Sequence, residues 1–104
     1  PGPQFPWRRL AQAGLILWPD AAQVAERLAF HRGQPLPEVV WFQQRLATVG
    51  YRVPQSGELD PATRQVISTF QMKYRPPDIG GEPDAETAAL LEVVSTPGGM
   101  RALP

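Results

Sequence analysis

The stretch "DPATRQVISTFQMKYRP", residues 60–76, carries a helix start, a core stripe and a helix stop. Asp60 is a preferred N-cap residue, and Pro61 suits the first helical position because no amide hydrogen is needed there. The side chains expected to face the core follow at helical spacing: Thr63, Val66, Ile67, Phe70 and Tyr74. Pro76 and Pro77 then end the pattern, so we predict one complete helix within this stretch.

A similar helix start recurs 24 residues later. When position 57 is aligned with position 81, "GELDPATRQVI" lies over "GEPDAETAALL", and the Gly, Glu, Asp and Thr residues coincide. Glycine permits a turn with positive φ, and aspartate accepts hydrogen bonds from free helix amides. Two well-built helix starts can resemble each other without being a repeat, but we favour two matched turns that stack side by side. Asp60 and Asp84 are then caps rather than acid or base catalysts, because a helix N-terminus favours the charged carboxylate.

Other segments also predict helices. Asp20 begins "DAAQVAERLAF", and Gln23 three residues later completes a capping box. Its apolar face is thin, which suggests a helix lying on a surface larger than this sequence can supply. A short helix is expected from about Pro6 to Gly14, and the last residues, 96–104, lack periodicity and are expected to be a flexible tail.

The strongest apolar stripe lies between Glu38 and Val49. Its core-facing side chains are Val39, Phe42, Leu46 and Val49. Gly50 occupies the usual left-handed cap position, and Tyr51 can fold back on the last turn. A third capped helix is predicted from Asp84 to Val94.

Composition excludes several classes of function. The 104 residues include ten basic and ten acidic side chains, so no field favours nucleic acid or an anionic membrane. The sequence has no cysteine, which removes disulfides and thiolate chemistry. His31 is the one histidine, whereas a zinc site needs three or four convergent ligands, so we expect His31 to be a surface or packing residue. No Ser-His-Asp arrangement is credible, so the residues favour binding over catalysis.

The residues from Val40 to Val94 resemble a known family. The motifs "QQRLATVGY", "GELDPATRQVISTFQ" and "GEPDAETAALL" are similar to the three-helix peptidoglycan-binding domain attached to bacterial cell-wall hydrolases. That family has a first helix ending in Leu-Gly-Tyr, here Val49-Gly50-Tyr51. Two Gly/Asp/Thr turns then surround a helix with Phe-Gln, here Phe70-Gln71. The resemblance implies that peptidoglycan or muropeptides are the partners.

The N-terminal stretch "PGPQFPWRRLAQAGLILWP" resembles the segment that closes the catalytic domain of AmpD/AmiD-like zinc-dependent N-acetylmuramoyl-L-alanine amidases. This implies a parent enzyme that hydrolyses the amide between N-acetylmuramic acid and L-alanine. In that family an Asp and two His ligands hold the zinc, and this sequence contains none of the three. Zinc is therefore expected only in a catalytic domain outside this sequence, which Trp7 and Trp18 would face.

Together these patterns predict an all-α chain with four parts. Residues 1–19 would end the amidase domain, 20–37 would form a connecting helix and linker, 38–95 a three-helix peptidoglycan-binding bundle, and 96–104 a tail. A parent that acts on intact cell wall would belong in the periplasm or outer membrane of a Gram-negative bacterium.

Glycan strands and stem peptides require aromatic faces, hydrogen-bond donors and cations. The side chains that offer these groups near the ends of the first two bundle helices are Tyr51, Arg52, Gln71, Lys73, Tyr74 and Arg75. We predict a shallow peptidoglycan-binding groove from this set. The alternative is a docking or oligomerisation module without direct glycan binding, because the same bundle face also suits a protein partner.

Overall fold

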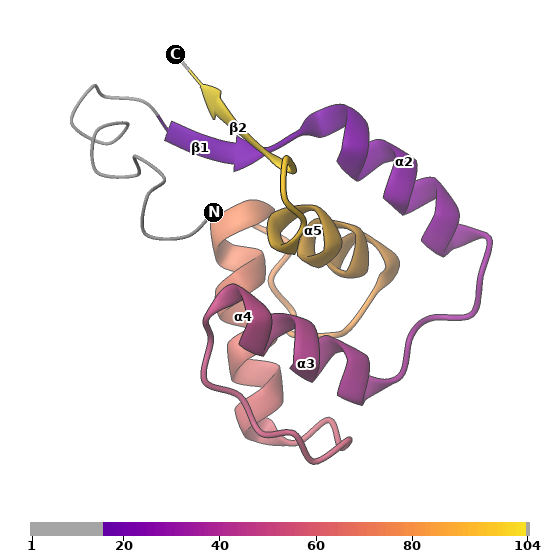
Figure 1. Cartoon of the computed structure of the whole chain (residues 1–104). Helices are drawn as coiled ribbons and strands as arrows, with labels where there is room; N and C mark the ends of the chain where they lie inside the picture. Colours follow the sequence, from indigo (N-terminus) through magenta and orange to yellow (C-terminus); the bar gives the residue numbers. More distant parts are fainter. Residues whose placement is uncertain (1–15, 104) are drawn as a thin grey trace.

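The computed structural model describes residues 16–103, which form four helices and a small two-stranded sheet (Figure 1). The elements follow in the order β1 (Ile16–Pro19), α2 (Ala21–Arg32), α3 (Val39–Val49), α4 (Pro61–Tyr74), α5 (Ala85–Ser95) and β2 (Met100–Leu103). The chain is mostly helical, as predicted, but the all-α class omitted the sheet. The short helix expected from Pro6, and Trp7 with it, lie outside the described residues.

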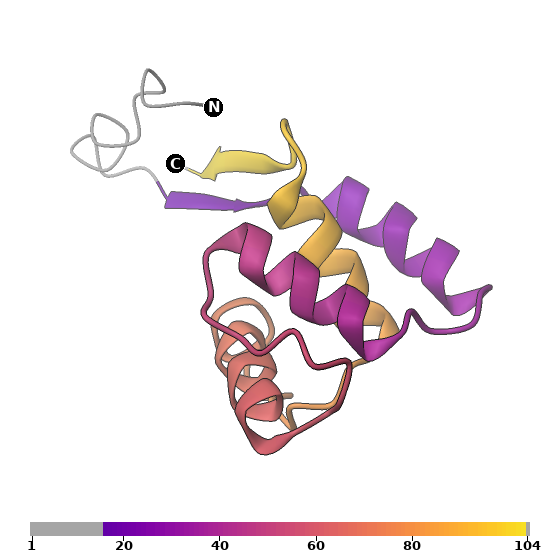
Figure 2. The same cartoon turned by 60° about the horizontal axis from the view of Figure 1, so that its bottom comes forward.

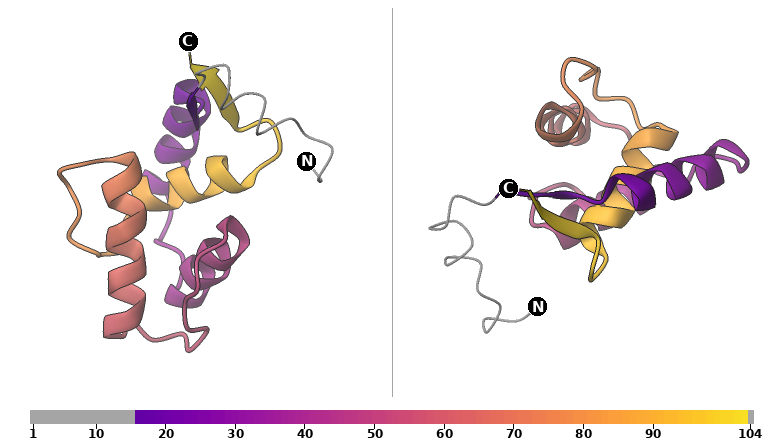
Figure 3. Two further views of the ribbon diagram at one scale, coloured as in Figure 1. Left: turned by 90° about the vertical axis from the view of Figure 1, so that its left-hand side faces the viewer. Right: turned by 90° about the horizontal axis from the view of Figure 1, so that it is seen from above.

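Helix α5 is the central element, because α2 and α3 both pack against it (Figure 2). Buried residues occupy most of its surface: Thr87, Ala88, Ala89, Leu90, Leu91 and Val93. A helix that is apolar on nearly every side needs neighbours on several sides. Helix α4 crosses α5 and completes the core from a third direction (Figure 3).

The hydrophobic core belongs to α3, α4 and α5. It consists of Phe42, Leu46, Ile67, Phe70, Ala88, Leu90 and Leu91. Phe42 and Phe70 are its largest fully buried side chains, and burial of each contributes about 2 kcal/mol relative to exposure. These are the faces that the helical stripes of the sequence predict.

The end of α3 forms the predicted left-handed cap. Gly50 has φ 119°, and its amide donates to the carbonyls of Ala47 and Leu46 at 3.0 and 3.1 Å. The amide of Tyr51 donates to the Leu46 carbonyl at 3.0 Å, and the Tyr51 side chain packs against the core. The cap therefore directs Tyr51 back toward α4, because a residue in the left-handed conformation reverses the chain.

Helix α2 begins at the predicted cap, but it packs against a different surface from the one expected. Asp20 accepts a hydrogen bond from the Gln23 amide at 3.0 Å. The Gln23 side chain does not complete a capping box; it donates to the Gly98 carbonyl at 3.0 Å. The expectation that α2 needs a larger surface than this sequence supplies was wrong. Its thin face lies on α5, with Val24 packed against the core.

The two strands join the ends of the described chain. β1 and β2 are antiparallel, with Ile16 opposite Leu103 and Pro19 opposite Met100. The Asp20 amide donates to the Gly99 carbonyl at 2.7 Å, which continues the pairing. The prediction of a flexible tail over 96–104 was therefore wrong for residues 100–103, because β1 supplies the hydrogen-bond partners that this short segment lacks on its own.

Candidate functional site

Two fully buried glutamines organise the loops of the bundle. The Gln43 Nε2 donates to Thr63 Oγ1 at 2.9 Å and to the Glu58 carbonyl at 3.2 Å, and its Oε1 accepts from the Gly57 amide at 2.8 Å. Both Gln43 and Gln71 have no exposed surface. An amide side chain suits this place because it presents donor and acceptor at one end.

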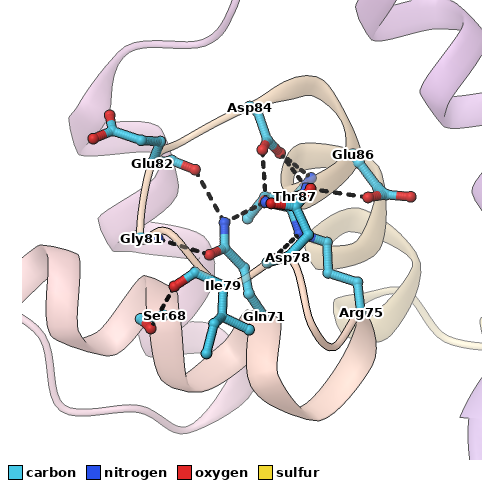
Figure 4. A network of polar contacts seen from close by, with 10 residues as sticks. All are labelled: Ser68, Gln71, Arg75, Asp78, Ile79, Gly81, Glu82, Asp84, Glu86 and Thr87. Carbon is cyan, nitrogen blue, oxygen red and sulfur yellow. Dashed lines mark hydrogen bonds and ion pairs between the residues drawn. The ribbon is translucent and has the colours of Figure 1, made fainter.

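Gln71 repeats the arrangement around the second loop. Its Nε2 donates to Thr87 Oγ1 at 2.9 Å and to the Glu82 carbonyl at 3.0 Å, while its Oε1 accepts from the Gly81 amide at 2.9 Å (Figure 4). The bonded loop residues are those that the 24-residue repeat aligns. The two matched turns are confirmed, and each is bonded by the glutamine of an upstream Phe-Gln pair, 42–43 or 70–71. These pairs lie 28 residues apart, so they fall outside the 24-residue alignment. That recurring dipeptide is the signal that would have identified Gln43.

The paired aspartates are caps, as predicted. Asp60 accepts from the Thr63 amide and Asp84 from the Thr87 amide, each at 2.8 Å. Hydrogen bonds from the Thr63 side chain and amide hold the pKa of Asp60 below its usual value. Burial pushes the pKa of Asp84 upward, but hydrogen bonds from Arg75 and Thr87 outweigh burial and lower it. Both groups stay charged and structural at neutral pH.

Arg75 is held by an acidic cluster rather than offered to a ligand. Its Nη2 lies 2.7 Å from Asp84 Oδ2, its Nη1 lies 3.1 Å from Glu86 Oε1, and its Nε donates to the Asp78 carbonyl at 2.8 Å (Figure 4). The side chain is only 10% exposed. These contacts join the end of α4 to the start of α5.

Two of the six predicted contacts are therefore corrected. Gln71 is buried and every polar atom of its side chain is used within the fold, and Arg75 is saturated by carboxylates. Both residues lie near a helix end, where polar side chains often meet ligands. Their partners come from the loop that follows α4 and from the start of α5, which the helical pattern of α4 could not indicate.

The remaining four residues include two aromatic rings that the fold brings together. The Phe70 ring lies 6.2 Å from Tyr51 and 4.8 Å from Tyr74, measured between centroids. Both tyrosines are half-buried. Burial raises the pKa of Tyr51, and the nearby Tyr74 raises it further. Tyr51 therefore keeps its hydroxyl proton at neutral pH and can donate a hydrogen bond.

Cationic side chains accompany these rings. Lys73 is exposed, and its Nζ lies 5.3 Å from the centroid of the Tyr74 ring. Arg52 is exposed and follows Tyr51 directly in the chain. The arrangement offers aromatic surface beside positive charge, which can bind a ligand that has apolar faces and carboxylates.

Trp18 extends the aromatic surface from another element. Its ring centroid lies 5.2 Å from that of Tyr74, with an interplanar angle of 54°. We define the aromatic row as Trp18, Tyr74, Phe70 and Tyr51. Sequence reasoning placed Trp18 against a catalytic domain, and it had no local signal for a contact between positions 18 and 74.

His31 has a packing role. It is 6% exposed, its Nε2 contacts Glu92 Oε1, and its ring lies 5.9 Å from that of Trp41. Within residues 16–103, no group of three or more His, Cys, Asp or Glu side chains is placed to hold a metal ion. In that same part of the chain, each helix is too short or too polar to cross a membrane.

A family model for a peptidoglycan-binding domain matches residues 35–91, which is more than half of the chain. The chain belongs to the peptidoglycan-binding domain family. The matched part contains α3, α4, most of α5 and both glutamine-centred loops, so the repeat belongs to this domain. Trp18 and α2 lie before it.

The proteins that are similar to this chain include amidases. N-acetylmuramoyl-L-alanine amidase AmiD from Escherichia coli (strain K12) is 41% identical over 95 residues, covering 90% of this chain and 34% of that protein. The chain thus spans about a third of the length of this relative.

Two solved structures are also similar. One is AmpDh3 from Pseudomonas aeruginosa in complex with anhydromuramic pentapeptide, with a TM-score of 0.67 and 32% identity over 88% of this chain and 36% of that one. The other is AmiD from E. coli in complex with the substrate anhydro-N-acetylmuramic acid-L-Ala-D-gamma-Glu-L-Lys. It has a TM-score of 0.62 and 41% identity over 88% of this chain and 35% of that one.

Proposed function

We propose that this chain binds peptidoglycan as the non-catalytic portion of a bacterial N-acetylmuramoyl-L-alanine amidase. The observation that carries the proposal is the aromatic row with Lys73 beside it, on a domain of the peptidoglycan-binding family. The proposed contacts are Tyr51, Arg52, Lys73 and Tyr74, to which Trp18 is added.

Each proposed contact has a chemical reason. Aromatic faces pack against the C–H groups of sugar rings, and tyrosine hydroxyls add hydrogen bonds. Lys73 and Arg52 can pair with the carboxylates of stem peptides, which carry negative charge at neutral pH. No bond is broken by these groups, so the role of the chain is to bind and to orient.

The catalytic part of the proposed parent lies outside this sequence. Amidase relatives of about three times this length support that arrangement. Residues 1–19 would lead out of the catalytic domain, and α3 to α5 would form the three-helix bundle that holds the wall. Binding to the wall raises the effective substrate concentration around the catalytic site. The proposed location is the periplasm or outer membrane of a Gram-negative bacterium.

Zinc is expected in the catalytic domain of the parent rather than in this chain. The described residues do not fit a zinc site, because His31 already contacts Glu92 and no metal-binding group of side chains forms around it. A four-coordinate zinc needs three or four protein ligands at one point. Hydrolysis of the amide is therefore assigned to the proposed catalytic domain.

The test is co-sedimentation of the full chain with purified, insoluble peptidoglycan. We expect the chain to pellet with peptidoglycan, and Lys73→Ala to pellet less, because one proposed cation is lost. Arg32→Ala is the matched control, since Arg32 is an exposed cation at the far end of α2. If Lys73→Ala and Arg32→Ala pellet equally, Lys73 does not contact peptidoglycan.

A docking role is the second candidate. Ile16 and Leu103 face each other at the end of the sheet and are 61% and 41% exposed. Exposed apolar pairs of this kind favour a protein contact. Failure of the chain to pellet with peptidoglycan, together with stable binding to the amidase catalytic domain, would favour docking over wall binding.

A further inference from the structure

A groove of about 330 Å³ lies between α2 and the end of α4 where it meets α5. Its lining comes from β1, α2, α4 and α5: Trp18, Pro19, Ala21, Val24, Ala25, Leu28, Tyr74, Glu86 and Leu90. Only Tyr74, Glu86 and Leu90 belong to the matched region 35–91. The groove is therefore a feature of the junction between the peptidoglycan-binding domain and the segment that precedes it.

Aromatic rings form one wall of the groove. Trp18 and Tyr74 meet at 5.2 Å with an angle of 54°, and both are half-buried, so part of each ring remains exposed. Val24, Leu28 and Leu90 add aliphatic side chains to the apolar surface. Such a lining stabilises a ligand that has flat apolar faces.

Ion pairs of the mostly buried Arg75 hold this wall in place. Arg75 follows Tyr74 directly, and its guanidinium bonds Asp84 and Glu86 at the start of α5. Because the Arg75 side chain is only 10% exposed, the end of α4 and the first turn of α5 are fixed to each other. The positions of Tyr74 and Leu90 across the groove are therefore set before any ligand arrives.

The charge of the groove favours the uncharged sugars of peptidoglycan over the carboxylates of its stem peptides. Glu86 is its one charged lining residue, and it shares the Arg75 guanidinium with Asp84, so negative charge is in excess at this side of the groove. The carboxylates of stem peptides would lose hydration here and would be repelled by this negative charge. An uncharged N-acetylated sugar has no such cost.

We propose that this groove binds an N-acetylated sugar of the glycan strand, an inference that rests on the proposed peptidoglycan binding. The sugar ring packs against Trp18 and Tyr74, and the acetyl methyl group lies on the aliphatic wall. The acetamido N–H donates to the Glu86 carboxylate, whose side chain is 44% exposed and has a free oxygen. Lys73 and Arg52 lie outside the groove lining and remain for the stem peptide.

The direct test is a titration of the full 104-residue chain with N-acetylchitotriose, a peptide-free N-acetylated glycan, followed by amide and indole chemical shifts. We expect shifts at Trp18, Tyr74 and Leu90. Ala25→Lys places a long charged side chain in the groove and should weaken binding roughly tenfold. Ala29→Lys is the matched control, because Ala29 is also exposed on α2 but is not among the lining residues. It should change affinity by less than about twofold.

The outcomes separate this inference from the proposed function. Equal affinity of the two lysine variants, or shifts produced in the groove by a stem peptide but not by N-acetylchitotriose, would overturn the glycan groove even if the chain pellets with peptidoglycan. Binding of N-acetylchitotriose that Ala25→Lys abolishes would support the groove even if the chain fails to pellet. The exposed position of both alanines keeps folding intact, which the amide spectrum of each variant verifies.

Discussion

At the scale of single residues, the two buried glutamines explain why the loops of this domain have fixed shapes. Each amide closes one loop by bonding a glycine N–H, a glutamate carbonyl and a threonine hydroxyl. Among the described residues, no buried side-chain N or O atom lacks a hydrogen-bond partner. Removal of one glutamine amide would leave several buried groups without a hydrogen-bond partner.

Gln43→Leu should therefore destabilise the chain strongly. We expect a loss of about 3 kcal/mol in the free energy of unfolding, because the Gly57 amide and the Thr63 hydroxyl lose their buried partner. Urea unfolding measures the loss. Gln44→Leu changes the exposed neighbouring glutamine and should stay within about 0.5 kcal/mol of the parent chain. Equal effects at the two positions would contradict the role of Gln43.

The two repeat glycines predict a second contrast. Gly57 and Gly81 both have φ 77°, so alanine is strained at either position. A Cβ at Gly81 would also lie 2.8 Å from the Arg64 carbonyl oxygen, whereas one at Gly57 meets nothing within 4 Å. Gly57→Ala should cost about 1 kcal/mol, and Gly81→Ala at least about twice that, by thermal or urea unfolding. A smaller cost at Gly81 would show that the Arg64 backbone moves aside.

At the scale of elements, the junction of α4 and α5 depends on charge. Burial favours the neutral form of Asp84, but hydrogen bonds from Arg75 and Thr87 lower its pKa below the ordinary 3.8. A carboxylate with a lowered pKa stabilises the fold above its unfolded pKa, and that contribution is lost as the pH falls through the folded pKa. The junction should therefore weaken below about pH 4.

Asp84→Asn tests this dependence. At pH 7 we expect a loss of about 1 kcal/mol, because the ion pair to Arg75 is replaced by a neutral contact and the cap is kept. The free energy of unfolding should then fall less steeply between about pH 5 and pH 3 than in the parent chain. Asp78→Asn is the control, since its 77% exposed carboxylate lies 3.9 Å from Arg75. A parallel pH profile for Asp84→Asn would contradict the assignment.

Helix α2 is held on α5 by Glu92, which contacts Arg27 at 3.1 Å and also His31. Glu92→Ala leaves a buried histidine without its acidic partner and should open α2 locally. We expect amide hydrogen exchange in α2 to accelerate roughly tenfold, with smaller changes in α4. Glu26→Ala, at an exposed position on α2, should leave exchange nearly unchanged. Uniform acceleration across all helices would instead indicate global destabilisation.

The helices of the bundle could be predicted because their signals are local. Asp60, Pro61 and Gly50 each act within one turn of their own helix, and the structure has the corresponding caps. The packing of α2 against α5 could not be predicted, because His31 on α2 contacts Glu92, which lies 61 residues away in the sequence. The outward assignment of Gln71 and Arg75 failed for the same reason, since their partners lie in the following loop and helix.

At the scale of the whole molecule, the sheet brings the two ends of the described chain together. Ile16 pairs with Leu103, and Trp18 in the same strand reaches Tyr74. Neither contact has a pattern in the sequence, because a strand of four residues and an isolated aromatic pair carry no period. Tyr51, Arg52, Lys73 and Tyr74 stay predictions that were made from the sequence, whereas the contact of Trp18 with Tyr74 needed the structure.

The central claim is that Trp18, Tyr74 and Tyr51 of the aromatic row, together with Lys73 and Arg52, form a peptidoglycan-binding surface. Phe70 is fully buried and only supports the two tyrosine rings. The most direct measurement is chemical-shift mapping of the full chain with soluble muropeptides released from peptidoglycan. The account predicts saturable shifts at Trp18, Tyr51, Lys73 and Tyr74, with little change around Gln43 and Gly57 at the opposite loop. Saturable shifts confined to the exposed sheet end at Ile16 and Leu103, or no shifts at all, would contradict it.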